Sequence, residues 1–148
     1  MKKKMIVGAV VFEFSTDSED VNASWIKRTF SSEYNSLYIM TLGVVDELRS
    51  SGLAKRLLDQ TITFAQSRPN ISLISLHVVS YNKRAIKFYK RHNFDYLEYL
   101  SDHYHIMGKE YDGLKLGLFV NGGKRREKWL PWFKRVVFRM EIIDEWPV

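Results

Sequence analysis

The chain contains two consecutive stretches with the same pattern, an apolar β-prone segment, then a polar loop, then a segment with helical spacing. In the first, residues 37–45 are apolar, and residues 53–66 place their apolar side chains along one helical stripe. In the second, residues 73–79 read as a strand that is buried on both faces, and Asn82 can cap a helix running to about residue 92. This alternation predicts an α/β fold with a central sheet and flanking helices.

Further strands are expected on either side of these two units. Residues 5–14 suit a strand, which lies either at a sheet edge or inside a larger fold because it begins so near residue 1. Residues 15–36 read as a polar surface connection with a short strand at residues 24–29. Residues 96–100 and 114–120 predict two more strands, separated by a loop that contains His103, Tyr104 and His105.

Composition limits the class of protein. A length of 148 residues with 45% hydrophobic positions fits one folded domain, and the absence of cysteine excludes disulfides, thiolate metal sites and cysteinyl intermediates. The apolar stretch at residues 5–12 is shorter than the roughly 18 residues that cross a bilayer. Lysines at positions 2–4 imitate a signal peptide, but Glu13 follows too soon, so we expect neither a signal peptide nor a membrane-spanning segment.

The pattern Arg49-x-x-Gly52-x-Ala54 lies between the first strand and its helix. Backbone N–H groups at a helix start have no intrahelical partners and favour anions. Glycine allows a pyrophosphate to approach the backbone, a small alanine leaves the amides uncovered, and Arg49 adds a cation. Taken alone, this pattern predicts either a phosphate-binding turn or simply a basic loop that closes a strand–helix unit.

The second unit strengthens the phosphate interpretation. Residues 82–89 read Asn-Lys-Arg-Ala-Ile-Lys-Phe-Tyr, and Arg-His-Asn-Phe at residues 91–94 leads to the next strand. With the Arg49 turn, these motifs resemble the GCN5-related N-acetyltransferase (GNAT) superfamily. Residues 37–45, 76–82, 99–107 and 118–123 narrow the resemblance to its membrane-associated N-alpha-acetyltransferase F type, the N-alpha-acetyltransferase 60 family. The resemblance covers about residues 5–123.

This resemblance implies a GNAT acyl-CoA N-acyltransferase fold, a mixed central sheet with flanking helices, that uses acetyl-CoA as co-substrate and no metal. By the family's motifs, the pyrophosphate turn comprises Arg49, Ser50, Ser51, Gly52, Leu53 and Ala54. Backbone groups of Leu42, Gly43 and Val44 would bind the acetyl carbonyl and pantetheine amides where the strand splays from its neighbour. Asn82 and Tyr89 complete the implied coenzyme site, and Tyr89 would either protonate or orient the departing sulfur.

The resemblance also implies the catalytic and acceptor residues. Transfer to an amine needs a modest base, and His77, with an ordinary histidine pKa near 6.5, can act directly or through a water held by Tyr38. Tyr38 and Tyr104 are the implied substrate-binding residues. Without the resemblance, the favoured interpretation is structural: Tyr38 as a strand tyrosine with a satisfied hydroxyl and His77 as a buried histidine bonded to the backbone. His103 and His105 depart from the family's tyrosines, which predicts altered peptide selectivity rather than a zinc site.

Two regions set the expected organisation. Residues 1–123 predict the acetyltransferase domain without the family's opening strand and two helices, so it is N-terminally truncated and lacks one wall of the peptide groove. Residues 124–148 predict a basic amphipathic tail that either packs on the domain or lies on an anionic membrane. Through the resemblance, the second option implies peripheral binding to the cytoplasmic face of Golgi or other internal membranes.

The resulting prediction is an N-alpha-acetyltransferase that acts on protein N-termini, chiefly those starting with Met. A non-catalytic acetyl-CoA-binding remnant and a lysine or histone acetyltransferase remain as alternatives. The net charge of +6 and the basic residues of the second helix also suggest nucleic-acid binding, but a solvated or coenzyme-facing surface explains them as well. We therefore expect no nucleic-acid partner.

Overall fold

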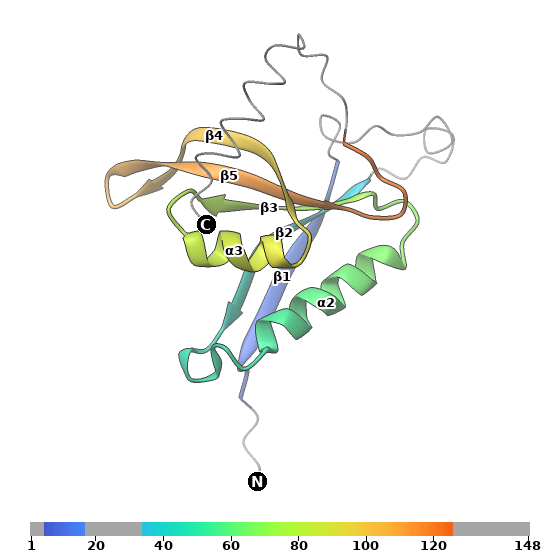
Figure 1. The fold of residues 1–148 in the computed structure, drawn as a ribbon, viewed down its shortest axis with the longest axis horizontal. Coiled ribbons are helices and arrows are strands. Elements are labelled where there is room, and N and C mark those ends of the chain that lie inside the picture. Colours follow the sequence, from blue (N-terminus) through green and yellow to red (C-terminus); the bar gives the residue numbers. More distant parts are fainter. Residues whose placement is uncertain (1–4, 17–33, 126–148) are drawn as a thin grey trace.

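The computed structural model describes residues 5–16 and 34–125. Within these ranges, five strands form one mixed sheet in the order β1-β2-β3-β5-β4 (Figure 1). The strands are β1 (Gly8–Ser15), β2 (Ser36–Val44), β3 (Leu73–Val79), β4 (Asp95–Ile106) and β5 (Lys109–Phe119). Two α-helices, α2 (Leu53–Gln66) and α3 (Lys83–Arg91), follow β2 and β3, and a short 3-10 helix, η1 (Asp46–Leu48), precedes α2. The mixed α/β fold predicted from the strand–helix alternation is confirmed.

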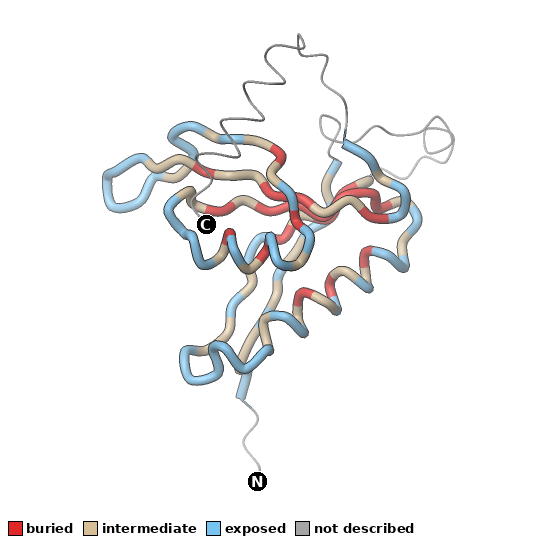
Figure 2. The backbone as a smooth tube through the Cα atoms, in the orientation of Figure 1, coloured by how far each residue is buried: buried red, intermediate tan, exposed pale blue. Residues whose placement is uncertain are grey.

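Both helices cover the same face of the sheet. Leu58 of α2 and Ile86 of α3 belong to one buried cluster with Leu37 and Ile39 of β2 and Leu76 of β3. Figure 2 shows this burial concentrated in the central strands and on the inward sides of the two helices. Because side chains alternate along a strand, Tyr38 and His77 point to the opposite face, where the described part of the chain places no helix.

The sheet consists of two antiparallel parts that meet at one parallel pair. β1 pairs with β2 and β3 with β5, which in turn pairs with β4. The parallel ladder between β2 and β3 runs only over Ser36–Ile39 and Leu73–Leu76. Beyond it the two strands diverge, as the teal and green arrows of Figure 1 show.

The predicted loop around His103, Tyr104 and His105 is wrong, because all three residues lie in β4. β4 and β5 form one long hairpin that turns at Met107 and Gly108, which have φ values of 51° and 76°. Pairs such as Tyr104 with Tyr111 carry the ladder past a bulge between Leu100 and Tyr104. The continued ladder satisfies backbone groups that a loop would leave to water, which is why both strands extend beyond their predicted limits.

The other predicted elements agree with the structure within a few residues. α2 and β3 have their predicted bounds, Asn82 caps α3, and β1 begins at Gly8 rather than residue 5. β1 lies at one end of the described sheet. The predicted strand at residues 24–29 and nearly all of the predicted tail lie outside the described residues. None of the helices in the described ranges is long and apolar enough to span a bilayer.

Candidate active site

The turn that begins α2 has the backbone conformation predicted for anion binding. Gly52 is the N-cap with φ of 84°, and Ser50 is also left-handed at 63°. The N–H of Arg56 donates to the Gly52 carbonyl at 3.0 Å, so the amides of the residues between them precede the first intrahelical bond. A Cβ added to Gly52 would meet no heavy atom within 4 Å. Glycine is therefore required here by its φ, and its missing side chain leaves the turn open.

Ser51 and Leu53 are used differently from the rest of the predicted turn. The Ser51 hydroxyl donates to the Leu48 carbonyl at 2.6 Å, which closes the turn from within. The Leu53 side chain lies beside Gly8 of β1, where an added Cβ would stand 3.3 Å from it. Arg49 forms an exposed ion pair with Asp46 at 2.5 Å. The side chains of Ser51 and Leu53 thus support the turn and do not line the cleft described next.

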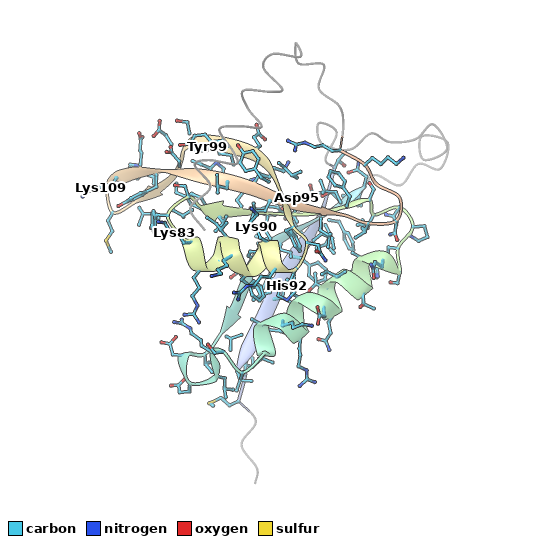
Figure 3. The ribbon with its side chains drawn as sticks, viewed as in Figure 1. Lys83, Lys90, His92, Asp95, Tyr99 and Lys109 are labelled. Carbon is cyan, nitrogen blue, oxygen red and sulfur yellow. The ribbon has the colours of Figure 1, made fainter. Side chains whose placement is uncertain are left out.

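A cleft of about 740 Å³ joins this turn to α3 and to the diverging end of β2. Nine residues predicted for the coenzyme site line it: Leu42, Gly43, Val44, Arg49, Ser50, Gly52, Ala54, Asn82 and Tyr89. The structure therefore brings three separate sequence segments to one cavity. Figure 3 shows His92 on the side of α3 that faces α2, and His92 lines the same cleft.

The cleft is strongly basic. Besides Arg49, its lining includes four further cations: Lys55, Arg84, Lys87 and Arg91. The sequence alone leaves two interpretations of the basic residues of α3, a solvated face and a coenzyme-facing one. Their one-turn spacing from Arg84 to Lys87 and Arg91 was the available signal, since residues three and four apart share a helix face. Lys83 and Lys90 are not among the lining residues.

Tyr89 places a buried phenol against the inner wall of the cleft. Its side chain packs against Phe94 with ring centroids 5.4 Å apart, and the residue is 8% exposed. Burial raises the pKa of Tyr89 to about 12, so the phenol keeps its proton at neutral pH. The Asn82 side chain accepts a hydrogen bond from the Ala85 N–H at 3.1 Å and fixes the start of α3.

The cleft adjoins the part of β2 that has diverged from β3. Leu42, Gly43 and Val44 pair with β1, whereas the parallel ladder with β3 stops at Ile39. In the described sheet, their backbone groups on the β3 side therefore face the gap rather than a neighbouring strand. A slender chain lying in the cleft can form strand-like hydrogen bonds there.

Tyr38 and His77 meet on that opposite face. The Tyr38 hydroxyl lies 3.1 Å from His77 Nδ1, and the two rings make an edge contact at 5.2 Å. Burial, and then the charge of Glu13, raise the pKa of Tyr38, while a hydrogen bond with the His77 backbone and the charge of Lys115 oppose this rise. Tyr38 is thus a neutral phenol that can share a proton with the imidazole.

The β4 hairpin completes this face. The His103 ring contacts His77 at 4.7 Å and Tyr104 at 5.0 Å. Burial and the neighbouring Tyr38 raise the pKa of Tyr104. His105 is instead paired in register with Glu110. Within the described ranges, no three His, Asp or Glu side chains are grouped so that they could hold a metal ion.

Comparison with known proteins agrees with this geometry. The profile of the Acetyltransferase (GNAT) family matches residues 2–94. N-alpha-acetyltransferase 60 of Xenopus tropicalis is 32% identical over 122 residues, or 80% of this chain and 50% of the relative. Histone acetyltransferase MCC1 of Arabidopsis thaliana is 34% identical over 92 residues, or 62% of this chain and 37% of the relative.

A solved structure, Arabidopsis thaliana NAA60 in complex with acetyl-CoA, is similar with a TM-score of 0.66 and 30% identity. The similarity covers 79% of this chain and 67% of the other. The chain spans about half the length of the Xenopus relative, so the match concerns this part of that protein. Motifs, sheet topology and family profile agree, and the chain belongs to the acetyltransferase (GNAT) family.

Proposed function

We propose that this chain transfers the acetyl group of acetyl-CoA to the N-terminal α-amine of proteins. The observation that carries the proposal is the hydrogen-bonded pair Tyr38 and His77, which lies across the sheet from a basic cleft. The proposal brings the two faces together at the gap between β2 and β3, whose pairing ends at Ile39 and Leu76. A donor bound in the cleft and an acceptor on the other face can therefore meet at the gap.

The cleft fits the chemical groups of acetyl-CoA. Gly52 and the amides at the start of α2 suit a pyrophosphate, and the cations Arg84, Lys87 and Arg91 suit further phosphate charge. The backbone of Leu42, Gly43 and Val44 suits the amides of the pantetheine arm. When bound, acetyl-CoA supplies an activated thioester carbonyl.

On the acceptor face, His77 acts as the base. An α-amine with a pKa near 8 is about one-tenth neutral at pH 7, so a weak base is sufficient. As the amine nitrogen bonds to the carbonyl carbon and the carbon–sulfur bond breaks, His77 takes the amine proton, directly or through a water at Tyr38. Tyr89 can return a proton to the sulfur or simply orient it, because its phenol stays protonated.

The acceptor class is tested by a peptide comparison. Full-length protein is incubated with acetyl-CoA and with Met-starting peptides that contain no lysine, or with N-terminally blocked peptides that contain one. We expect the protein to acetylate the first set of peptides. The His77→Ala substitution should abolish most of this acetylation. Acetylation of the blocked peptides alone would favour a lysine acetyltransferase, a class represented by the histone acetyltransferase similarity. Acetyl-CoA binding without transfer to either set would favour the non-catalytic alternative.

The cellular setting follows from the tail sequence. Residues 124–148 combine aromatic residues with Lys and Arg at helical spacing, which is typical of a helix lying in a membrane interface. We therefore extend the proposal to peripheral attachment on the cytoplasmic face of Golgi or other internal membranes. The clients would then be proteins with Met-starting N-termini exposed at that surface.

A further inference from the structure

The ring of His103 contacts the ring of His77, the proposed base. Its ring centroid is 4.7 Å from that of His77, and the planes are inclined by 81°. His103 is exposed, whereas His77 is half-buried. The two imidazoles come from β4 and β3, which are separated in the sheet by β5. Reaching across a strand requires the β4 backbone to depart from a regular ladder at this point.

The departure is a bulge with its own side-chain anchor. The register of the β4–β5 ladder shifts between Leu100 and Tyr104, and Asp102, which lies in this bulge, has φ of 51°. The Asp102 N–H donates to one carboxylate oxygen of Asp112 at 3.0 Å, and the Tyr99 hydroxyl donates to the other. These bonds hold the bulge and therefore the backbone that precedes His103.

A glycine on β5 makes room for the contact. A Cβ added to Gly113 would lie 3.2 Å from His103 and 3.1 Å from Tyr104. Such distances are tighter than ordinary van der Waals contact, so any larger residue would push both rings away. The bulge and Gly113 together set the distance between His103 and His77.

The charged and titratable groups around His77 come from four strands. Tyr38 hydrogen-bonds it from β2, and Lys115 is its register partner on β5. Tyr104 and His103 approach from β4, and Glu13 of β1 lies one strand farther away, opposite Tyr38. Two of these neighbours, Lys115 and a protonated His103, disfavour a positive charge on His77.

We propose that His103 is a positioning residue that acts through His77, because a positive charge on the His103 ring disfavours protonation of the His77 ring. His103 is exposed to water and His77 is half-buried, so a positive charge on the His103 ring is solvated better than one on the His77 ring. A charge on His103 would keep His77 neutral, and able to accept a proton, to lower pH than His77 would alone. The coupling between the two histidines is inferred from their ring contact alone, whereas its effect on catalysis rests on the proposed function.

The test is a histidine titration by NMR on the full-length protein. The His77 ring signals are assigned with His77→Asn and followed from pH 4.5 to 8.5 in wild type, in His103→Phe and in the control His105→Phe. His103→Phe keeps a ring at the contact but cannot carry charge. We expect the His77 titration midpoint to rise by about half a pH unit or more in His103→Phe, as a unit charge at this distance predicts. His105→Phe should leave the midpoint unchanged.

An unchanged or lowered midpoint in His103→Phe would overturn the proposal. If that variant fails to fold, His103→Asn removes the charge with a smaller side chain and decides by the same criterion. The pH–rate profile then separates the two claims. If the His77 midpoint rises in His103→Phe and the acidic limb of the pH–rate profile shifts by the same amount, both the coupling and the proposed function are supported. If the midpoint rises but the protein has no transferase activity, the coupling is supported and the proposed function is refuted.

Discussion

Tyr38 and His77 are 39 positions apart in the sequence, yet the phenol oxygen of one lies 3.1 Å from Nδ1 of the other. The two side chains come from parallel neighbours, and the ladder between these strands ends within one residue of each. The pair therefore stands at the edge of the gap, where a donor from the cleft would emerge. This placement makes a proton-transfer role testable by removing each polar atom separately.

Tyr38→Phe and His77→Ala should each lower the transfer rate by about 100-fold or more, the usual scale for a positioned acid or base. Acetyl-CoA affinity should stay near wild type, because the cleft lies on the other face of the sheet. Steady-state kinetics with a Met-starting peptide measure the rate, and calorimetry measures the affinity. Near-wild-type turnover in both variants would refute the assignment.

The anion-binding turn can be tested with two glycines of similar conformation. Gly52→Leu should weaken acetyl-CoA binding by about tenfold or more, because the new side chain projects over the turn that suits the pyrophosphate. Gly108→Leu is the matched control: Gly108 has φ of 76°, its added Cβ meets nothing within 4 Å, and it lies at the hairpin tip. Both substitutions bear the same backbone strain, so calorimetry isolates the effect of the cleft. Equal affinities would exclude the turn as a binding element.

The anchor of the bulge predicts a pH-dependent stability. Hydrogen bonds from Tyr99 and then from the Asp102 N–H hold the pKa of Asp112 below its usual 3.8. A lowered folded-state pKa means that the stabilisation is complete above about pH 5 and disappears as pH falls through the folded value. Asp112→Asn should therefore melt at a lower temperature than wild type at pH 7, and the difference should shrink near pH 3. Glu110→Gln, on the same strand, should show no such convergence in thermal melts.

The tail makes a prediction that the described residues do not test. Deleting residues 128–148 should release the protein from anionic liposomes and leave acetyl-CoA affinity unchanged. If the tail binds an anionic surface, the removed residues Lys134, Arg135 and Arg139 should each contribute roughly 1 kcal/mol of attraction, in addition to that from the apolar side chains of Trp132 and Phe133. Co-sedimentation and a thermal melt measure the outcome. A lower melting temperature with unaltered sedimentation would show that the tail packs on the domain instead.

Much of the central fold could be predicted because its signals are local. The helical stripe of residues 53–66 and the apolar run of residues 73–79 gave correct bounds, since neither depends on distant partners. The hairpin extension was missed because His103 and Tyr104 look like loop residues until their partners on β5 are known. The available signal was Met107-Gly108 between two segments of mixed polarity, which is a hairpin pattern.

The site was predictable to the extent that it depends on motifs. The glycine turn and the Asn82 cap are recognisable from spacing, and the structure brings them to one cleft. The contribution of Arg84, Lys87 and Arg91 could not be decided from sequence, because a helix shows which residues share a face but not what that face meets. The contact between His103 and His77 depends on a bulge and had no sequence signal.

The short parallel ladder between Ser36–Ile39 and Leu73–Leu76 also has a consequence for cooperativity. It is the only strand pairing in the described sheet that joins the β1–β2 ribbon to the three strands β3, β5 and β4. A molecule bound across the gap would contact both β2 and β3 and strengthen the connection between these strands. Its binding would stabilise the folded state by mass action. Addition of acetyl-CoA should therefore slow amide hydrogen exchange in both half-sheets together, including strands such as β4 that do not line the cleft.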